Sequence, residues 1–188
     1  MIRMFLDDCR AYIGSLRLRA VWRTRGVHVA PGAGIRGHVE IGPGAIIGRD
    51  AVLVAGPNAR IVVGAGAVIN HRCFITAKRF IEIGANVLFA NNVFVSDHGH
   101  ELGDGSRAVV RLGATTPVPV RIGAGAFIGI NVVVLAGSGI GNGAVIGANS
   151  VVTGEIPARA VAVGAPARVI RNRTIHMEQR SRHATQAV

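Results

Sequence analysis

The amino-acid sequence predicts an all-β fold, a parallel solenoid whose short strands repeat every six residues. The chain has 188 residues, with 26 glycines, 49% hydrophobic residues and only 4% aromatic residues. Glycine is about twice as frequent as the usual ~7%. A six-residue period of aliphatic residues is a multiple of the two-residue strand period and fits neither a helix nor a coiled coil. The chain is too apolar for disorder and long enough for one domain with a buried core.

Residues 1–29 are expected to form a helical cap. Between residues 4 and 24 apolar side chains recur on one helical face, with arginines on another. We expect this helix to cover the open backbone edge of the first coil. The alternative is peripheral contact with an anionic membrane surface through Arg3, Arg10 and Arg17. The apolar face is formed by Phe5, Cys9, Tyr12, Ile13, Leu16 and Ala20.

No secretion signal or membrane span is evident in the sequence. The N-terminus carries two aspartates, Asp7 and Asp8, and no stretch reaches the ~18 apolar residues of a spanning helix. The two cysteines, Cys9 and Cys73, are too few for a disulfide framework and too far apart for a zinc site. We therefore expect a cytoplasmic protein, associated with the inner face of the membrane if the N-terminal helix binds there.

Residues 30–157 carry the repeat. The aliphatic period begins at Ile35 and slips before Val63 and Ile83. Glycine usually follows the aliphatic residue directly, and the third residue after it is usually Gly, Asn or Asp, the types that tolerate positive φ. Each unit is therefore a strand with one inward side chain and a tight corner, and the coils hydrogen-bond as a parallel solenoid. The longest unbroken run is Ile122, Ile128, Val134, Ile140, Ile146 and Val152.

One interruption, between Val95 and Ile122, is too long for a corner. We expect an inserted loop over residues 97–121, and loops of that length within a compact domain are usually functional. At its base His98 occupies the place that holds Gly, Asn or Asp in other units. A histidine there can take a proton from a hydroxyl or amine near neutral pH. The alternative is a structural corner residue with positive φ, which histidine also tolerates.

The six-residue unit resembles the hexapeptide repeat of acyltransferases that fold as left-handed parallel β-helices, with three units in each triangular coil. The resemblance covers residues 30–175, and the handedness is implied by it alone. Residues 68–101, VINHRCFITAKRFIEIGANVLFANNVFVSDHGHE, are similar to the active-site region of galactoside- and maltose-type and polysaccharide-biosynthesis O-acetyltransferases. The same resemblance implies a homotrimer with active sites between neighbouring solenoids.

The resemblance also implies roles on the acceptor side of the site. It makes His98 the general base and Asn70 an acceptor-binding residue, and it places Lys78 where the family has an acidic acceptor-site residue. A cation at that place favours a phosphorylated or acidic glycan over a simple galactoside. The candidates for a supporting role beside His98 are Asp97, His100, Glu101 and Asp104.

Residues 122–171 resemble the C-terminal half of these enzymes, where the co-substrate acetyl-CoA lies in a groove between subunits. We expect residues 158–188 to be a CoA-contacting segment and tail. Backbone groups would meet the pantetheine arm and guanidinium groups the phosphates, a pairing that guanidinium geometry favours. The residues implied are Gly129 and Ala148 for the pantetheine arm, Thr153 nearby, and Arg168 and Arg171 for the phosphates.

The expected function is acetyl-CoA-dependent O-acetylation of a sugar hydroxyl, in polysaccharide or glycolipid biosynthesis, by direct transfer. The alternatives are N-acetylation of an amino sugar or xenobiotic, a zinc carbonic anhydrase-like site from His71, His98 and His100, and a non-catalytic scaffold. We expect no metal. The net charge of +11 concentrates at the two ends of the chain without a helix-turn-helix, zinc finger or aromatic stacking surface. Nucleic acid is therefore not an expected partner.

Overall fold

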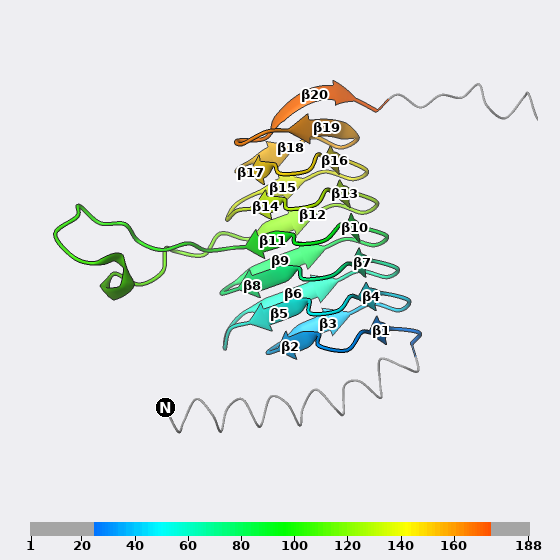
Figure 1. Ribbon diagram of the computed structural model, residues 1–188, viewed down its shortest axis with the longest axis horizontal. Coiled ribbons are helices and arrows are strands. Elements are labelled where there is room, and N and C mark those ends of the chain that lie inside the picture. Colours follow the sequence, from blue (N-terminus) through cyan, green and yellow to red (C-terminus); the bar gives the residue numbers. More distant parts are fainter. Residues whose placement is uncertain (1–24, 174–188) are drawn as a thin grey trace, which may run out of the picture.

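The computed structural model describes residues 25–173, which form a stack of three-sided coils (Figure 1). Most of the helical cap expected over residues 1–29, including the helix at 4–24, and the tail from residue 174 lie outside the described residues. The all-β solenoid is confirmed, because the described part contains twenty short strands and a single 3₁₀ turn, η1 (Val109–Arg111). Within this part of the chain no helix is long and apolar enough to cross a membrane.

The strands form three sheets, one on each side of the coil, and the chain visits the sheets in turn. Sheet 1 contains β1 (His28–Val29), β4 (Ile46–Ile47), β7 (Val68–Ile69), β10 (Leu88–Phe89), β13 (Phe127–Ile128), β16 (Val145–Ile146), β19 (Ala160–Val163) and β20 (Arg168–Asn172). Sheet 2 contains β2 (Gly34–Arg36), β5 (Val52–Ala55), β8 (Phe74–Ala77), β11 (Phe94–Ser96), β14 (Val133–Val134) and β17 (Val151–Val152). Sheet 3 contains β3 (Val39–Ile41), β6 (Arg60–Val63), β9 (Phe80–Ile83), β12 (Val120–Ile122), β15 (Gly139–Ile140) and β18 (Glu155–Ile156). We call the edge between sheets 1 and 2 corner 1–2, and the edge between sheets 2 and 3 corner 2–3.

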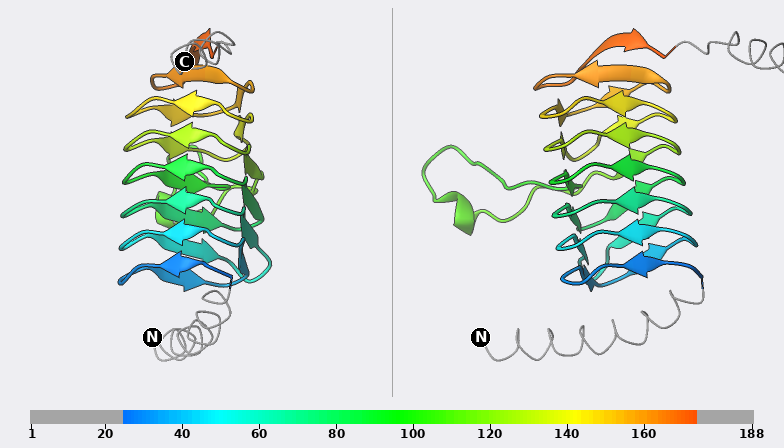
Figure 2. Two further views of the ribbon diagram at one scale, coloured as in Figure 1. Left: turned by 90° about the vertical axis from the view of Figure 1, so that its right-hand side faces the viewer. Right: turned by 45° about the vertical axis from the view of Figure 1, so that its right-hand side comes forward.

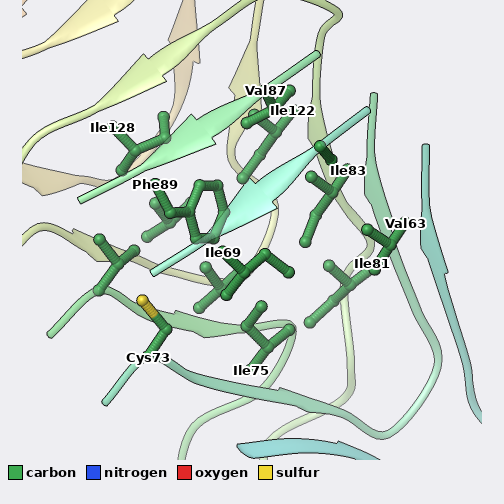
Figure 3. Packing of buried hydrophobic residues seen from close by; sticks show 14 of the residues in the cluster. Val63, Ile69, Cys73, Ile75, Ile81, Ile83, Val87, Phe89, Ile122 and Ile128 are labelled. Atoms are coloured by element: carbon green, nitrogen blue, oxygen red, sulfur yellow. The ribbon is translucent and has the colours of Figure 1, made fainter. Parts of the chain in front are cut away.

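Equivalent residues stack along the solenoid because each strand pairs in parallel with the strand one coil away. In sheet 1, Ile69 pairs with Ile47 on one side and with Phe89 on the other, and Phe89 pairs with Ile128. These four residues belong to the six-residue period and are fully buried. Figure 3 shows Ile69, Phe89 and Ile128 packed in the core. The solenoid is of the left-handed β-helix type, as the resemblance implies.

The parallel pairing continues past residue 157, where the repeat was expected to end. β19 pairs in parallel with β16 and extends sheet 1 by one strand. β20 then turns back and pairs antiparallel with β19, with Val163 opposite Arg168. The first part of the expected CoA-contacting segment is thus a strand pair at the C-terminal end of the stack, and β20 is exposed along its length.

The corners use the positive-φ conformation that the Gly, Asn and Asp positions predict. The third residue after the inward aliphatic side chain has φ between 55° and 76° at most corners. Arg72 takes the same conformation with φ 55°, whereas Gly56 does not adopt it. The expected residues that do adopt it are Gly44, Asp50, Gly66, Asn86, Asn92, Gly125, Asn131, Gly137, Gly143 and Asn149.

The glycine directly after the aliphatic residue is required by space between the coils. A Cβ atom on Gly84 would lie 2.6 Å from the backbone nitrogen of Ala124 and 2.9 Å from its Cα, one coil away. The atoms approached belong to the backbone of the facing coil, so no side-chain rotation can relieve the clash. Glycine therefore follows the aliphatic residue because successive coils approach each other closely at the end of the strand.

Replacing Gly84 with alanine is expected to lower the free energy of unfolding by about 1–3 kcal/mol, the usual cost of overpacking. Gly154→Ala is the matched control, because a Cβ atom there meets nothing within 4 Å. Thermal unfolding followed by circular dichroism should show a lower melting temperature for Gly84→Ala and an unchanged one for Gly154→Ala. Equal melting temperatures for the two variants would refute the packing argument.

Candidate functional site

The long loop leaves the solenoid at corner 2–3, between β11 and β12. It covers residues 97–119, since β12 begins at Val120, and it projects away from the coils (Figures 1 and 2). The backbone N–H of Val118 donates to the carbonyl of Asp97 at 2.8 Å, and that of Gly137 donates to the carbonyl of Val118 at 3.1 Å. The first bond joins the two ends of the loop to each other, and the second joins the loop to the adjoining coil.

Asp97, the first residue of the loop, has a fully buried side chain that binds the neighbouring coil. The backbone N–H of Lys78 donates to its Oδ1 at 2.8 Å. The N–H groups of Arg79 and Phe80 donate to its Oδ2 at 2.7 and 2.8 Å. The carboxylate therefore satisfies three backbone donors at corner 2–3, at the level where the loop interrupts the stacking of coils.

The same carboxylate holds His98. The Nδ1 atom of His98 lies 2.8 Å from Oδ1 of Asp97, and only 14% of the His98 side chain is exposed. The hydroxyl of Ser96 donates to the backbone carbonyl of His98 at 2.7 Å. An ionised carboxylate only accepts hydrogen bonds, so Nδ1 is the donor and the Nε2 lone pair remains to take a proton. Among the described residues Nε2 has no hydrogen-bond partner.

The two histidines at the base of the loop differ in their surroundings. His98 is not among the described residues with positive φ, so the alternative that it is a positive-φ corner residue is wrong. His100 is exposed, and its backbone forms an antiparallel bridge with Ala114 inside the loop. The histidine that the solenoid holds in place is therefore His98, whereas His100 belongs to the projecting loop.

Three carboxylates were candidates to orient His98, and Asp97 is the one in contact with it. Glu101 is exposed on the loop. Asp104 accepts the backbone N–H of Ser106 at 2.9 Å, and hydrogen bonds from Ser106 lower the pKa of the Asp104 carboxyl. Asp104 thus belongs to a turn of the loop, which leaves Asp97 as the partner of the imidazole.

Lys78 and Arg79 form the corner that Asp97 binds. Their backbone N–H groups donate to that carboxylate, and both residues are exposed. The structure therefore brings Lys78 close to His98. Arg79 and Ser96 were not singled out in the sequence. Arg79 could have been found from the sequence, because it is a second cation next to Lys78 at a corner. Ser96 could not, because nothing in the six-residue repeat indicates its hydrogen bond to His98.

Asn70 lies on a different edge of the solenoid from His98. It falls between β7 and β8, which places it at corner 1–2, whereas His98 lies at corner 2–3. Gly129 and Ala148 also lie at corner 1–2, in adjacent coils, since a Cβ on Gly129 would approach the Ala148 nitrogen to 2.7 Å. One copy of the chain therefore does not bring Asn70 next to His98.

The remaining residues expected at the donor site lie toward the C-terminal end. Thr153 follows β17 at corner 2–3 and is exposed. Arg168 and Arg171 lie in β20 and are exposed, and Nη1 of Arg168 donates to the carbonyl of Ala167 at 3.0 Å. Neither guanidinium is paired with a carboxylate of the described residues. Both are therefore available to anionic groups.

Cys73 and His71 have structural partners. Burial raises the pKa of the Cys73 thiol, whose Sγ lies 3.2 Å from the carbonyl of Ala90, so the thiol is a poor nucleophile. His71 lies at corner 1–2, where its Nδ1 accepts the backbone N–H of Arg49 at 3.0 Å, and it does not face His98. Across residues 25–173 no three His, Cys, Asp or Glu side chains form a group that would hold a metal ion.

The fold and the repeat together define a hexapeptide-repeat β-helix. Residues 119–154 match the family model described as bacterial transferase hexapeptide (six repeats). These residues include β12 to β17, and the loop ends where the match begins.

Several curated relatives are similar to the chain over about half its length or more. A probable acetyltransferase of Mycobacterium tuberculosis is 40% identical over 119 residues, which make up 63% of this chain and 37% of that protein. Escherichia coli K12 has a putative lipopolysaccharide biosynthesis O-acetyl transferase that is 37% identical over 111 residues, 55% of this chain and 56% of that one. Its galactoside O-acetyltransferase is 39% identical over 113 residues, 60% and 54% of the two chains. The chain thus matches less than two thirds of the length of each of these relatives.

Two solved structures share the architecture. A maltose O-acetyltransferase from Clostridium difficile 630 superposes with a TM-score of 0.55 at 29% identity, over 83% of this chain and 74% of that one. The N-acyltransferase AntD from Bacillus cereus, in complex with dTDP and coenzyme A, gives a TM-score of 0.69 at 19% identity, over 79% and 82% of the chains. The second likeness shows the fold alone. The resemblance to hexapeptide-repeat acyltransferases of the galactoside and maltose type is confirmed.

Proposed function

We propose that this protein is an acetyl-CoA-dependent O-acetyltransferase that modifies a sugar hydroxyl, with His98 as the general base. The observation that carries the proposal is the Asp97–His98 pair. A buried carboxylate holds Nδ1 at 2.8 Å and leaves Nε2 to act on a substrate at the base of the loop. The relatives named O-acetyltransferases support this class of reaction, and the lipopolysaccharide enzyme supports a role in polysaccharide or glycolipid synthesis.

The proposed reaction is a direct transfer. His98 Nε2 removes the proton of the acceptor hydroxyl while the hydroxyl oxygen attacks the thioester carbonyl carbon of the substrate acetyl-CoA. Asp97 keeps the imidazole oriented and stabilises the imidazolium that forms. The carbon–sulfur bond then breaks, and the imidazolium returns the proton to the sulfur of coenzyme A. The hydroxyl gains the acetyl group and the thiol is regenerated, so no other reactant is needed.

The donor-side residues fit coenzyme A. Gly129 and Ala148 present backbone with at most a methyl group at corner 1–2, which suits the close passage of a narrow chain. Arg168 and Arg171 carry exposed guanidinium groups suited to phosphates. These four residues would bind the pantetheine arm and the phosphates. Thr153 lies on the other edge, at corner 2–3, and would approach the donor only from a neighbouring copy.

We propose a homotrimer in which each site lies between two copies. Two faces of the solenoid present apolar side chains outward. They include Leu88 and Phe127, paired on sheet 1, and Phe74 and Phe94, stacked on sheet 2 with ring centroids 5.9 Å apart. Sheet 3 is polar, with ion pairs such as Glu82 to Arg121. Asn70 and His98 lie on different edges of one copy, so a site that uses both residues would take them from two copies, as the resemblance to the acyltransferase family implies.

The experiment for the activity follows the release of free thiol from acetyl-CoA with a panel of sugars, amino sugars and glycans. Turnover with sugars supports the proposal, and exclusive turnover with amines would replace it by N-acetylation. Stoichiometric zinc after purification, with no acetyl transfer, would point to the carbonic anhydrase-like alternative. Failure to bind coenzyme A would favour the alternative of a non-catalytic scaffold. A cytoplasmic location stays a prediction.

The shared site predicts complementation between two variants that are each inactive. Asn70→Ala removes the acceptor residue and His98→Ala removes the base. If each site takes Asn70 from one copy and His98 from another, random mixing in equal amounts restores about a quarter of the sites. The measurement is turnover after co-expression of the two variants, with each variant expressed alone as the control. Mixtures that stay at the activity of the single variants would show that the two residues do not act across copies.

A further inference from the structure

Corner 2–3 carries an unusual pair of residues at one level, directly below the loop. The other short turns along this edge contain glycine, namely Gly37, Gly56, Gly137 and Gly154. Between β8 and β9 the turn is instead Lys78–Arg79. The turn does not require these types, because neither residue has positive φ among the described residues. At the level where the loop and His98 are placed, the turn therefore has no glycine and consists of two long cationic side chains.

Asp97 ties this pair to His98. Its Oδ1 accepts the backbone N–H of Lys78 and contacts Nδ1 of His98, both at 2.8 Å. The Lys78 backbone and the imidazole are therefore only two hydrogen bonds apart. Oδ2 accepts the N–H of Arg79 at 2.7 Å. A buried carboxylate thus fixes the points from which both cationic side chains extend beside the proposed base.

The two positive charges have no acidic partner in the described part of the chain. The carboxylate of Asp97 is fully buried and already receives three backbone N–H groups and the imidazole. The ion pairs found among described residues involve Glu40, Glu82 and Asp97, and none includes Lys78 or Arg79. Both side chains are exposed, so both are available to an anion.

We propose that Lys78 and Arg79 bind an anionic group, a phosphate or a carboxylate, that the acceptor sugar carries close to the hydroxyl to be acetylated. The inference rests on the proposed function and names its substrate class. The guanidinium plane pairs with two oxygens of such a group, and the ammonium adds a compact charge. The reacting hydroxyl must lie within hydrogen-bond distance of His98 Nε2. The anion therefore belongs to the same or the adjacent sugar.

The test compares glucose, glucose 6-phosphate and glucuronic acid as acceptors for the full chain and for Lys78→Gln and Arg79→Gln. Each substitution should raise KM for the charged acceptors roughly tenfold or more, the usual effect of losing a charged hydrogen bond, with kcat and the KM for acetyl-CoA unchanged. Lys78→Arg should restore the KM. Arg25→Gln, an exposed charge at the turn before β1, is the matched control and should change nothing. The two charged sugars distinguish a phosphate from a carboxylate.

Titration calorimetry with glucose 6-phosphate separates this inference from the proposed function. Binding to the unchanged protein but not to the Lys78→Gln/Arg79→Gln double variant supports the anion site even if no acetyl group is transferred, and in that case the proposed function alone fails. Equal KM values for glucose and its charged derivatives, or variants with unchanged KM for them, would overturn the inference. A rise in the KM for acetyl-CoA alone would also overturn it, because the cations would then bind the donor.

Discussion

Replacing His98 with alanine is expected to lower kcat for acetyl transfer by about 10²–10⁴-fold, the usual contribution of a general base. The KM for acetyl-CoA should change little, since the donor residues lie at other positions of the solenoid. Asp97 holds the imidazole at 2.8 Å in a largely buried place. An alanine there has no group that can accept the proton of the acceptor hydroxyl. Steady-state kinetics of thiol release measures both constants.

His100→Ala is the comparison for this variant. His100 is also a histidine at the loop base, but it is exposed and has no bond to Asp97. Its loss should lower kcat far less than the loss of His98. A larger effect for His100→Ala than for His98→Ala would transfer the role of base to His100. Melting curves of both variants separate loss of catalysis from loss of fold.

Replacing Asp97 with asparagine is expected to impair both stability and activity. The carboxylate receives three backbone N–H groups and the imidazole on its two oxygens. The asparagine amide has only one oxygen. Its NH₂ group would face N–H donors at the place of the second oxygen, and an NH₂ group cannot accept hydrogen bonds from them. We expect the free energy of unfolding to fall by about 3 kcal/mol, the scale for breaking a buried charged network. The imidazole also loses its acceptor, so kcat should fall by about 10²-fold or more.

Asp104→Asn is the matched control, with the same chemical change on the same loop. Asp104 is exposed and bonds only to Ser106 within a turn, so its variant should keep its free energy of unfolding and its kcat. Chemical denaturation and steady-state kinetics give the two readouts. An Asp97→Asn protein that is as stable and as active as Asp104→Asn would contradict the role assigned to the buried carboxylate.

The fold was predictable because its rules are local. A period of six fixes which side chain points inward, and Gly, Asn or Asp fixes where the chain turns, so Ile69, Phe89 and Asn131 take the expected places. The reason for Gly84 was not predictable, because its neighbour Ala124 lies in another coil. The continuation of the parallel pairing into β19 was not predicted, because the sequence there leaves the six-residue period while its backbone still pairs with β16.

The site was predictable only in part. The sequence pointed to His98, but the choice of Asp97 over Glu101 and Asp104 depends on backbone N–H groups about one coil earlier in the chain. Periodicity also gave no warning that Asn70 and His98 lie on different edges, because the slips in the repeat hide which corner each residue occupies.

Transfer of deuterium-labelled acetyl from acetyl-CoA to an acceptor sugar, followed by mass spectrometry of the sugar, tests the central claim most directly. We expect the unchanged protein to produce a labelled acetyl ester that hydroxylamine removes, and His98→Ala to produce almost none. A hydroxylamine-resistant product would show an amide in place of the ester. Equal labelling of the sugar by the unchanged protein and by His98→Ala would contradict the role of His98 as the base.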